Sequence, residues 1–438
     1  MHRSILWAAA FSAAAALAQA QSVPTDNTVS NALKEINDLK VRTERLEKQV
    51  REPGAAAPAA PAVSSGSAYM NASFDVLVNG GWSTTPNVES IQPGDHDPKQ
   101  RGFSIRNAEL ALDGAVDPFF KAFANIVYKL EPDDSTSLEL EEAYAQSTSL
   151  PGDLQLKAGR YFAEFGRQNS QHPHAWDFVD QPLVMNRMWG SDGLKQNGAR
   201  LSWLAPTPFY TEAMLGVYDG QGDDAYSFRN VGATDANGIT RLYGHATSAR
   251  DLGGAGDLLY VPRLATSFDL SDEQTVVLGA SAALGPNDTG PDARTEVYGV
   301  DAYWKWKPAN AGEGWPFVKV QTEAMWRDFD AAADPSAGLP DEHLRDSGLY
   351  AQVLWGFVRG WVAGLRGDYV DGNAGASAAG NAQRGEARRI SPNLTYYFSE
   401  FAKLRLQYNY TSFAQGTDEQ AVWAQLEFMI GAHAAHKF

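Results

Sequence analysis

The alternation of apolar and polar residues from position 66 onward is the feature that most restricts the fold of this chain. In the segment 401–414, Leu404 and Leu406 share one face, whereas Lys403 and Arg405 fall on the other. A period of two residues is typical of a β-strand with two different faces. The pattern predicts sixteen strands, at 66–81, 101–115, 119–131, 136–148, 153–163, 195–205, 208–219, 259–270, 274–285, 293–307, 315–328, 347–358, 360–371, 386–399, 401–414 and 419–438.

The connections between these strands alternate in length, which is typical of a barrel in a bacterial outer membrane. Such barrels have short periplasmic turns and longer outer loops. The short connections are 116–118, 149–152, 206–207, 271–273, 359 and 400, and the long ones are 82–100, 164–194, 220–258, 329–346 and 372–385. Two expected outer loops, 132–135 and 415–418, are also short. We therefore expect an all-β fold, a closed 16-stranded antiparallel transmembrane β-barrel in contact with outer-membrane lipid.

Aromatic residues lie next to the short turns, where a barrel would meet the periplasmic interface of the membrane. The residues are Phe119, Phe120, Phe209, Tyr210, Phe268, Trp304, Trp306, Trp315, Phe317, Trp355, Phe357, Trp361, Tyr396, Phe398 and Phe401. We expect them to form one girdle. The segment 101–115 breaks the alternation, because Phe103 and Ile105 are out of phase with Leu110 and Leu112, and we expect a β-bulge there.

Three segments are expected ahead of the barrel at 66–438. Residues 1–20 have a basic start, an apolar run and a small-x-small site, which predicts a signal peptide; an uncleaved anchor helix is the alternative. Residues 21–51 are predicted to form a periplasmic coiled coil that joins several copies, the alternative being a helix folded back on the barrel rim. Residues 52–65 form a Pro/Ala linker. The coiled-coil seam would be Val29, Ala32, Ile36, Leu39, Thr43, Leu46 and Val50.

Charge and motifs exclude several classes of function. A net charge of −17 argues against nucleic-acid binding, which depends on basic residues. No arrangement of a nucleophile and a base indicates an enzyme. Glu141 and Glu142 are expected to point to opposite faces of one strand and so cannot share a proton.

Two histidine groups are candidate metal ligands. His172, His174 and Asp177 could bind a transition metal, because imidazole suits Zn²⁺ or Cu²⁺. His433 and His436 form a second, weaker candidate. A surface or pore-lining role without metal is favoured for the first group, so we expect no metal and no cofactor.

A barrel of sixteen strands leaves a water-filled channel. We expect the third outer loop, 164–194, to narrow it, because its apolar residues would be costly in water; a position over the mouth or in a subunit interface is the alternative. Strand parity predicts a basic wall facing acidic residues and a mild preference for anions. Pairing of the basic residues with Asp301, Glu323, Asp368 and Glu427 would cancel that preference. The predicted pore-lining residues are Arg167, Arg187, Lys305, Lys319, Arg327, Arg366, Arg389, Lys403, Arg405, Glu139 and Glu141.

The barrel segment of the chain resembles a known family. The stretch FSIRNAELALDGAVDPFFKAFANIVYKLEP, followed by LEEAY and LQLKAGRYFAEFG, is similar to the phosphate-selective porin O and P family. The resemblance implies a 16-stranded homotrimer, passive diffusion, and third loops that constrict each pore. Members of the family line the constriction densely with Arg and Lys, whereas this loop sets Arg167 and Arg187 against Glu164, Asp177 and Asp180.

These features predict an outer-membrane porin for passive diffusion of small hydrophilic solutes, with a preference for phosphate-like anions. The alternative is a structural envelope protein whose coiled coil contacts the cell wall and tethers the outer membrane to it. An open ohmic current would favour the porin, and a closed barrel would favour the tether.

Overall fold

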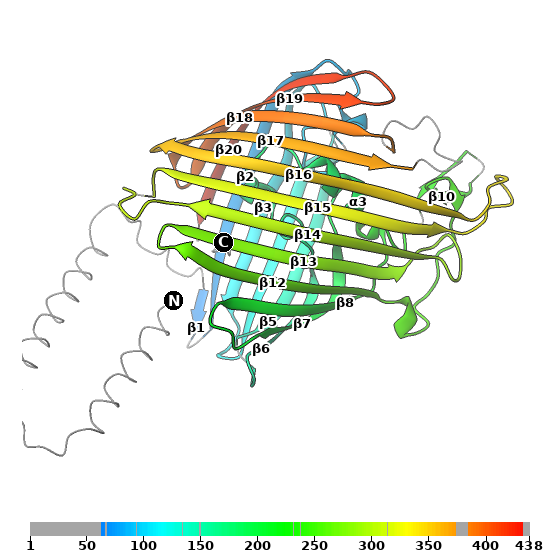
Figure 1. Cartoon of the computed structure of the whole chain (residues 1–438), viewed down its shortest axis with the longest axis horizontal. Coiled ribbons are helices and arrows are strands. Elements are labelled where there is room, and N and C mark those ends of the chain that lie inside the picture. Colours follow the sequence, from blue (N-terminus) through cyan, green and yellow to red (C-terminus); the bar gives the residue numbers. More distant parts are fainter. Residues whose placement is uncertain are drawn as a thin grey trace, which may run out of the picture. The chain divides into compact units, whose positions relative to one another are not determined.

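A closed antiparallel barrel dominates the computed structural model of the chain (Figure 1). The structure describes residues 63–65, 68–92, 94–133, 135–148, 150–230, 232–236, 238–312, 314–373 and 384–431. The predicted signal peptide, the coiled coil, most of the linker, His433 and His436 lie outside these ranges. No helix within them is long and apolar enough to cross a membrane.

Within the described ranges, sixteen strands follow one another around the barrel, each hydrogen-bonded to the next. The last strand pairs with the first and closes the ring. All sixteen predicted strands are therefore confirmed. They are β2 (Ala68–Ser83), β3 (Gly102–Ala115), β4 (Phe120–Leu130), β5 (Thr136–Ser147), β6 (Leu154–Phe162), β7 (Lys195–Leu204), β8 (Tyr210–Tyr218), β12 (Leu259–Ser271), β13 (Gln274–Pro286), β14 (Arg294–Trp306), β15 (Phe317–Ala331), β16 (Glu342–Val358), β17 (Trp361–Gly372), β18 (Ala387–Ser399), β19 (Ala402–Phe413) and β20 (Glu419–Gly431).

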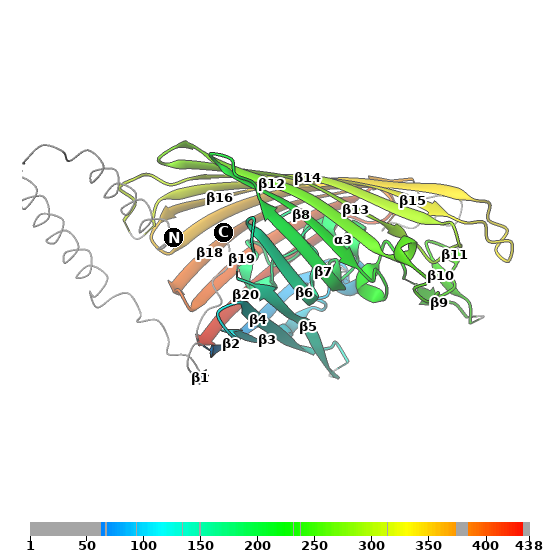
Figure 2. The ribbon, with the colours of Figure 1, turned by 90° about the horizontal axis from the view of Figure 1, so that it is seen from below.

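Short elements occupy the connections. β1 (Val63–Ser65) pairs with the start of β2. The longest outer loop contains a small sheet of its own, seen beside the barrel strands in Figure 2. The remaining elements are η1 (Val88–Ser90), η2 (Pro173–Ala175), α3 (Leu183–Trp189), η3 (Asp223–Ala225), β9 (Ala233–Thr234), β10 (Thr240–Leu242), β11 (His245–Ala246) and η4 (Ala255–Asp257).

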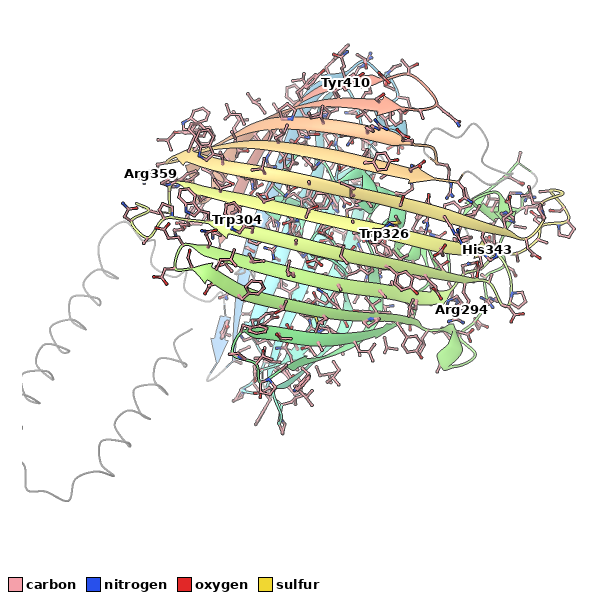
Figure 3. The ribbon with its side chains drawn as sticks, viewed as in Figure 1. Arg294, Trp304, Trp326, His343, Arg359 and Tyr410 are labelled. Carbon is pink, nitrogen blue, oxygen red and sulfur yellow. The ribbon has the colours of Figure 1, made fainter. Side chains whose placement is uncertain are left out.

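The barrel has an apolar outside and a polar inside, the reverse of a water-soluble protein. On the outer face, Val300 is 50 % exposed and Trp326 is 48 % exposed (Figure 3). On the inner face, charged residues such as Arg366 and Glu323 are each only 1 % exposed. Because alternate residues of each strand face lipid and lumen, the period-two pattern of the sequence is satisfied on both sides.

The girdle prediction is confirmed in part. Phe119, Phe209, Trp355 and Phe398 are exposed on the outer face near the short turns. Trp315 and Phe317, however, pack against Phe178, Leu354 and Val362 inside the barrel, so their placement in the girdle was wrong. Phe317 lies on the same face of β15 as the lumenal residues. Its position next to a turn, on which the girdle prediction was based, does not indicate the face.

Two β-bulges change which residues face the lumen. The first is in β3, where Leu77 pairs with Asn107 and Val78 with Ile105, which leaves Arg106 as the extra residue. This confirms the bulge expected in 101–115. The second is in β5 at Glu141, between the pairs Asn125–Glu142 and Ile126–Leu140, and the sequence pattern did not predict it.

One strand begins earlier than expected. β16 starts at Glu342 rather than at 347, because its hydrogen-bonded pairing with β15 continues through the pair Asp330–His343. The added residue Leu344 packs with Leu242 of the long outer loop and with Phe329. This apolar contact accounts for the extension.

Candidate functional site

The loop between β6 and β7, residues 163–194, lies inside the barrel. Its helix α3 is buried at every residue and packs against β15, β16 and β17. Met188 and Trp189 of the helix share a core with Val297, Met325 and Tyr350 of the barrel wall. Burial of this apolar face inside the barrel agrees with the position expected from the composition of the loop.

Asp180 anchors the loop to the wall. The residue is 1 % exposed. Its two carboxylate oxygens accept hydrogen bonds from Arg366 (2.6 Å), Arg389 (3.0 Å), Gln92 (3.1 Å), Gln407 (2.8 Å) and Asn409 (2.6 Å), and its backbone carbonyl accepts another from Arg366 (2.8 Å). Because these donors come from three strands and from the first outer loop, one carboxylate joins the inner loop to four other segments of the chain.

The charge of Asp180 depends on these partners. Burial alone would raise the pKa of its carboxyl, but Arg366 and Arg389 outweigh burial and lower the pKa to about 2. A lowered pKa in the folded state means that this carboxylate stabilises the fold above the ordinary pKa of 3.8. That contribution is lost as the pH falls through about 2.

We expect acid to release the loop before the barrel strands separate. At about pH 1.5, protonated Asp180 no longer holds Arg366 and Arg389, so pepsin should cut within residues 163–194; at pH 4 the loop should resist. The measurement is the rate of cleavage, divided at each pH by the rate for a denatured substrate. Equal normalised rates at the two pH values would contradict this expectation.

The structure places most of the predicted basic residues in bonds to the loop or to carboxylates. Arg366 also pairs with Asp368, and Lys403 with Glu427, which are two of the pairings that would cancel an anion preference. Asp301 pairs instead with Arg263, and Glu323 accepts a hydrogen bond from Tyr350. From the wall, Arg405 donates hydrogen bonds to the loop carbonyls of Trp176 (2.7 Å) and Phe178 (3.2 Å), and Lys403 donates one to the carbonyl of His174 (2.8 Å). From the loop, Arg187 donates a hydrogen bond to Asp346 of the wall (3.2 Å). Asp346 also accepts one from Arg327 (3.1 Å).

Lys305, Lys319 and Arg167 form a separate group, which we call the basic patch. Lys305 of β14 lies directly opposite Lys319 of β15, and both have lumenal parity. The Arg167 guanidinium lies over the ring of Tyr303 (4.1 Å to the centroid) and donates a hydrogen bond from Nε to Gln321 (3.1 Å). All three cations are partly exposed, unlike the arginines that bind Asp180.

The lumenal wall formed by β3 and β5 is acidic. Glu139 pairs with Lys129 (2.8 Å) and with Lys195. Glu141 lies 2.9 Å from His172 Nδ1 and 3.4 Å from His96 Nε2. Burial opposes protonation of His96, but the carboxylates of Asp192 and Glu141, 3.3 Å and 3.4 Å from its Nε2, raise its pKa to about 10. The pairing of His96 therefore stabilises the fold fully below about pH 6.5 and is lost as the pH rises through about 10.

The expectation that Glu141 and Glu142 point to opposite faces was wrong. Both are buried on the lumenal side, and both contact one imidazole, since Glu142 Oε2 lies 2.8 Å from His172 Nε2. The bulge at Glu141 shifts the parity of the strand by one residue and brings the two carboxylates together. The candidate metal group of His172, His174 and Asp177, which was not the favoured interpretation, is not assembled, because Asp177 accepts a hydrogen bond from Gln352 (3.2 Å).

A small cavity of about 10 Å³, roughly the space of one water molecule, lies between the loop and the acidic wall. Among its lining residues, Glu141 was assigned to the lumen by strand parity, and those of the loop 164–194 were expected there as part of the loop. His96 and Asp192 were not named individually because they are in loops, where no periodicity indicates which way a side chain points. The lining includes His96, Glu141, Phe162, Gln168, Gln171, Trp176, Gln181 and Asp192.

Comparison with known proteins identifies one relative by sequence. An uncharacterized protein of Aquifex aeolicus (strain VF5) is 31 % identical over 362 residues, which cover 78 % of this chain and 71 % of the relative. No protein-family model matches the chain. The resemblance to the phosphate-selective porins therefore has no matching family model behind it.

Solved structures share the fold at low sequence identity. The outer membrane channel DcaP of Acinetobacter baumannii has a TM-score of 0.56 at 12 % identity, covering 85 % of this chain and 100 % of that chain. An anion-selective porin from Comamonas acidovorans has a TM-score of 0.51 at 10 % identity, covering 83 % of this chain and 100 % of that chain. The barrel thus has the fold of outer-membrane porins.

Proposed function

The chain belongs to the same family as the Aquifex aeolicus protein and has the fold of outer-membrane porins, and from this premise we propose that it is a passive diffusion channel that favours small anions. The loop inside the barrel narrows the channel. The charged lumenal residues that are partly exposed then set the preference.

The basic patch is the observation that carries the anion preference. Two lysines directly opposite each other on neighbouring strands repel and so destabilise the sheet. A functional role in attracting anions would explain why both are present. Asp177, the nearby acid of the loop, accepts a hydrogen bond from Gln352. Lumenal cations of this kind raise the local concentration of anions, phosphate-like ones included.

Removing the two lysines should weaken the preference. At about 8 Å in water, one unit charge changes the energy of an ion by about 0.5 kcal/mol. Two charges therefore raise the local anion concentration about fivefold and lower the local cation concentration by the same factor, which changes the ratio of the two about 25-fold. We expect Lys305→Ala/Lys319→Ala to lower the chloride-to-potassium permeability ratio by up to that factor. The measurement is the reversal potential of planar bilayers in a potassium chloride gradient.

A matched control removes the same net charge outside the lumen. Arg345 and Arg388 are exposed near the outer rim, and Arg345→Ala/Arg388→Ala should leave the reversal potential close to that of the wild type. A cation-selective wild type, or a lysine variant with unchanged selectivity, would contradict the proposal.

We further propose that the chain assembles as a homotrimer in the outer membrane after its signal peptide is removed. Support comes from the heptad spacing between Val29 and Val50, which calls for partner helices. The linker at 52–65 would join these helices to the barrels. The remaining predicted lumenal residues, such as Arg366 and Arg405, would position the loop more than they contact solutes.

A further inference from the structure

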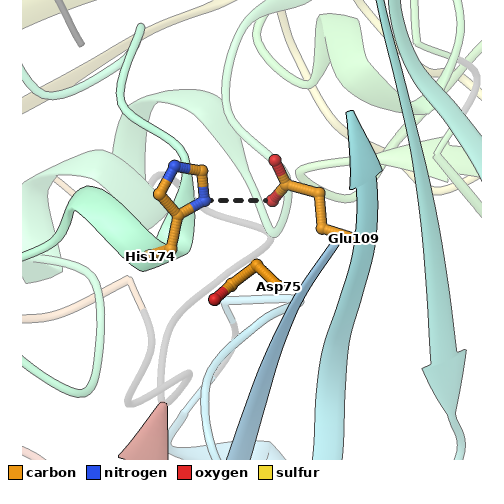
Figure 4. Close-up of side chains that lie close together, drawn as sticks. All are labelled: Asp75, Glu109 and His174. Carbon is orange, nitrogen blue, oxygen red and sulfur yellow. Dashed lines mark hydrogen bonds and ion pairs between the residues drawn. The ribbon is translucent and has the colours of Figure 1, made fainter. Parts of the chain in front are cut away.

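Two carboxylates and one imidazole converge on the acidic wall, away from the basic patch. Asp75 of β2 lies directly opposite Glu109 of β3, and His174 comes from η2 of the inner loop (Figure 4). His174 Nδ1 is 3.2 Å from Glu109 Oε2. One donor atom from each of the three residues lies within 4.8 Å of the other two.

Asp75 is the unusual member of this group. The residue is 4 % exposed, and neither of its carboxylate oxygens has a hydrogen-bond partner within the described part of the chain. A buried carboxylate without a partner is costly, so such groups are normally paired or bound to a metal. The nearby cation, Lys403, is engaged by Glu427 (2.7 Å) and by the carbonyl of His174 (2.8 Å). The unsatisfied oxygens of Asp75 therefore point to a cation.

We propose that Asp75, Glu109 and His174 bind one divalent transition-metal ion in the lumen. Carboxylate oxygen together with imidazole nitrogen suits Zn²⁺ and its neighbours, whereas Mg²⁺ and Ca²⁺ prefer oxygen alone. Three protein ligands leave a position on zinc for water or a solute. The second oxygen of Glu109 lies 3.7 Å from His172 Nδ1, which helps to orient the carboxylate.

The ion would connect the loop to the wall. His174 belongs to the loop, whereas Asp75 and Glu109 belong to neighbouring strands. Asp180 fixes the loop to β17, β18 and β19, through Arg366, Arg389 and Gln407. Metal binding would therefore add another attachment of the loop, to β2 and β3, a role distinct from solute passage.

Calorimetric titration of the full chain tests the proposal independently of conductance. Protein purified in detergent without a polyhistidine tag, and dialysed against a chelator, should bind one Zn²⁺ per chain at these residues and should not bind Mg²⁺. Bound Co²⁺ should show the absorption bands of a nitrogen- and oxygen-ligated ion. Asp75→Asn and His174→Gln should each weaken binding by about tenfold or more, since loss of even an indirect partner costs about 10–100-fold.

Controls separate this site from other acids and histidines. Asp113→Asn removes a carboxylate of β3 that pairs with Asn71 outside the group, and His343→Gln removes an exposed imidazole. Both should bind Zn²⁺ as the wild type does. A variant lacking His433 and His436 should also retain binding; loss of all binding in that variant would overturn the proposal.

Stability distinguishes a metal ligand from a structural residue. In metal-free protein, Asp75→Asn removes an unpaired buried charge and should not lower the urea midpoint of unfolding. Added Zn²⁺ should raise the midpoint of the wild type but not that of Asp75→Asn. Absence of Zn²⁺ binding to the wild type, or binding unchanged by both Asp75→Asn and His174→Gln, would overturn the proposal.

Discussion

Replacement of Asp180 by alanine should release the inner loop and raise the single-channel conductance about twofold or more, because the loop occupies the cross-section that sixteen strands leave open. The carboxylate holds two buried guanidinium groups, Arg366 and Arg389. Removing one partner of a buried ion pair costs about 3–5 kcal/mol, since the other charge stays buried without compensation. Arg366 keeps Asp368, but the loop itself loses its main attachment to this wall.

Planar-bilayer recording of Asp180→Ala beside the wild type measures this effect. Asp177→Ala is the matched control, because it removes an acid three residues away whose carboxylate accepts one hydrogen bond from Gln352. Its conductance should stay near that of the wild type. If Asp180→Ala also conducted as the wild type does, Asp180 would not hold the loop in the channel.

Replacement of Trp189 by alanine should loosen the second attachment of the loop, which is the apolar packing of α3. Its indole is 1 % exposed, meets Phe165 edge-on at 4.8 Å between ring centroids and stacks on Phe228 at 6.4 Å. Truncating a buried tryptophan to alanine costs about 3–5 kcal/mol. Because the lost contacts join α3 to the start of the inner loop and to an outer loop, we expect the loop to open while the strands stay paired.

Limited proteolysis of the folded barrel at neutral pH measures that opening. Trp189→Ala should be cut within residues 163–194 at least about tenfold faster than the wild type, since the lost free energy acts mainly on the loop. Trp326→Ala, which removes a lipid-facing indole, provides the control and should be cut no faster. Cleavage of Trp189→Ala at the wild-type rate would show that α3 is held by other contacts.

Strand periodicity explains why the fold could be predicted so closely. Alternate residues of a transmembrane strand must meet lipid and water in turn, so positions such as Lys305, Lys319 and Arg327 could be assigned to the lumen from parity alone. Asp75 and Glu109 follow the same rule and could have been included. The limit of the rule appears at Glu141, where one extra residue reverses the parity.

The candidate site could be predicted only in part, since its contacts connect distant segments. Asp180 meets residues up to 229 positions away, and nothing in the loop sequence indicates which wall residue it binds. His96 and Asp192 lie in two loops without periodicity, yet they form an ion pair at 3.3 Å. The apolar composition of the loop was enough to predict its position inside the barrel. The partners of its charged residues depend on the three-dimensional arrangement of distant strands.

Single-channel recording of the wild-type chain in planar bilayers tests the central claim most directly. A barrel narrowed but not closed by its inner loop should insert in discrete steps of ohmic current, and that current should carry more chloride than potassium. A chain that inserts without any conducting step would contradict the account and would favour a structural barrel that tethers the outer membrane.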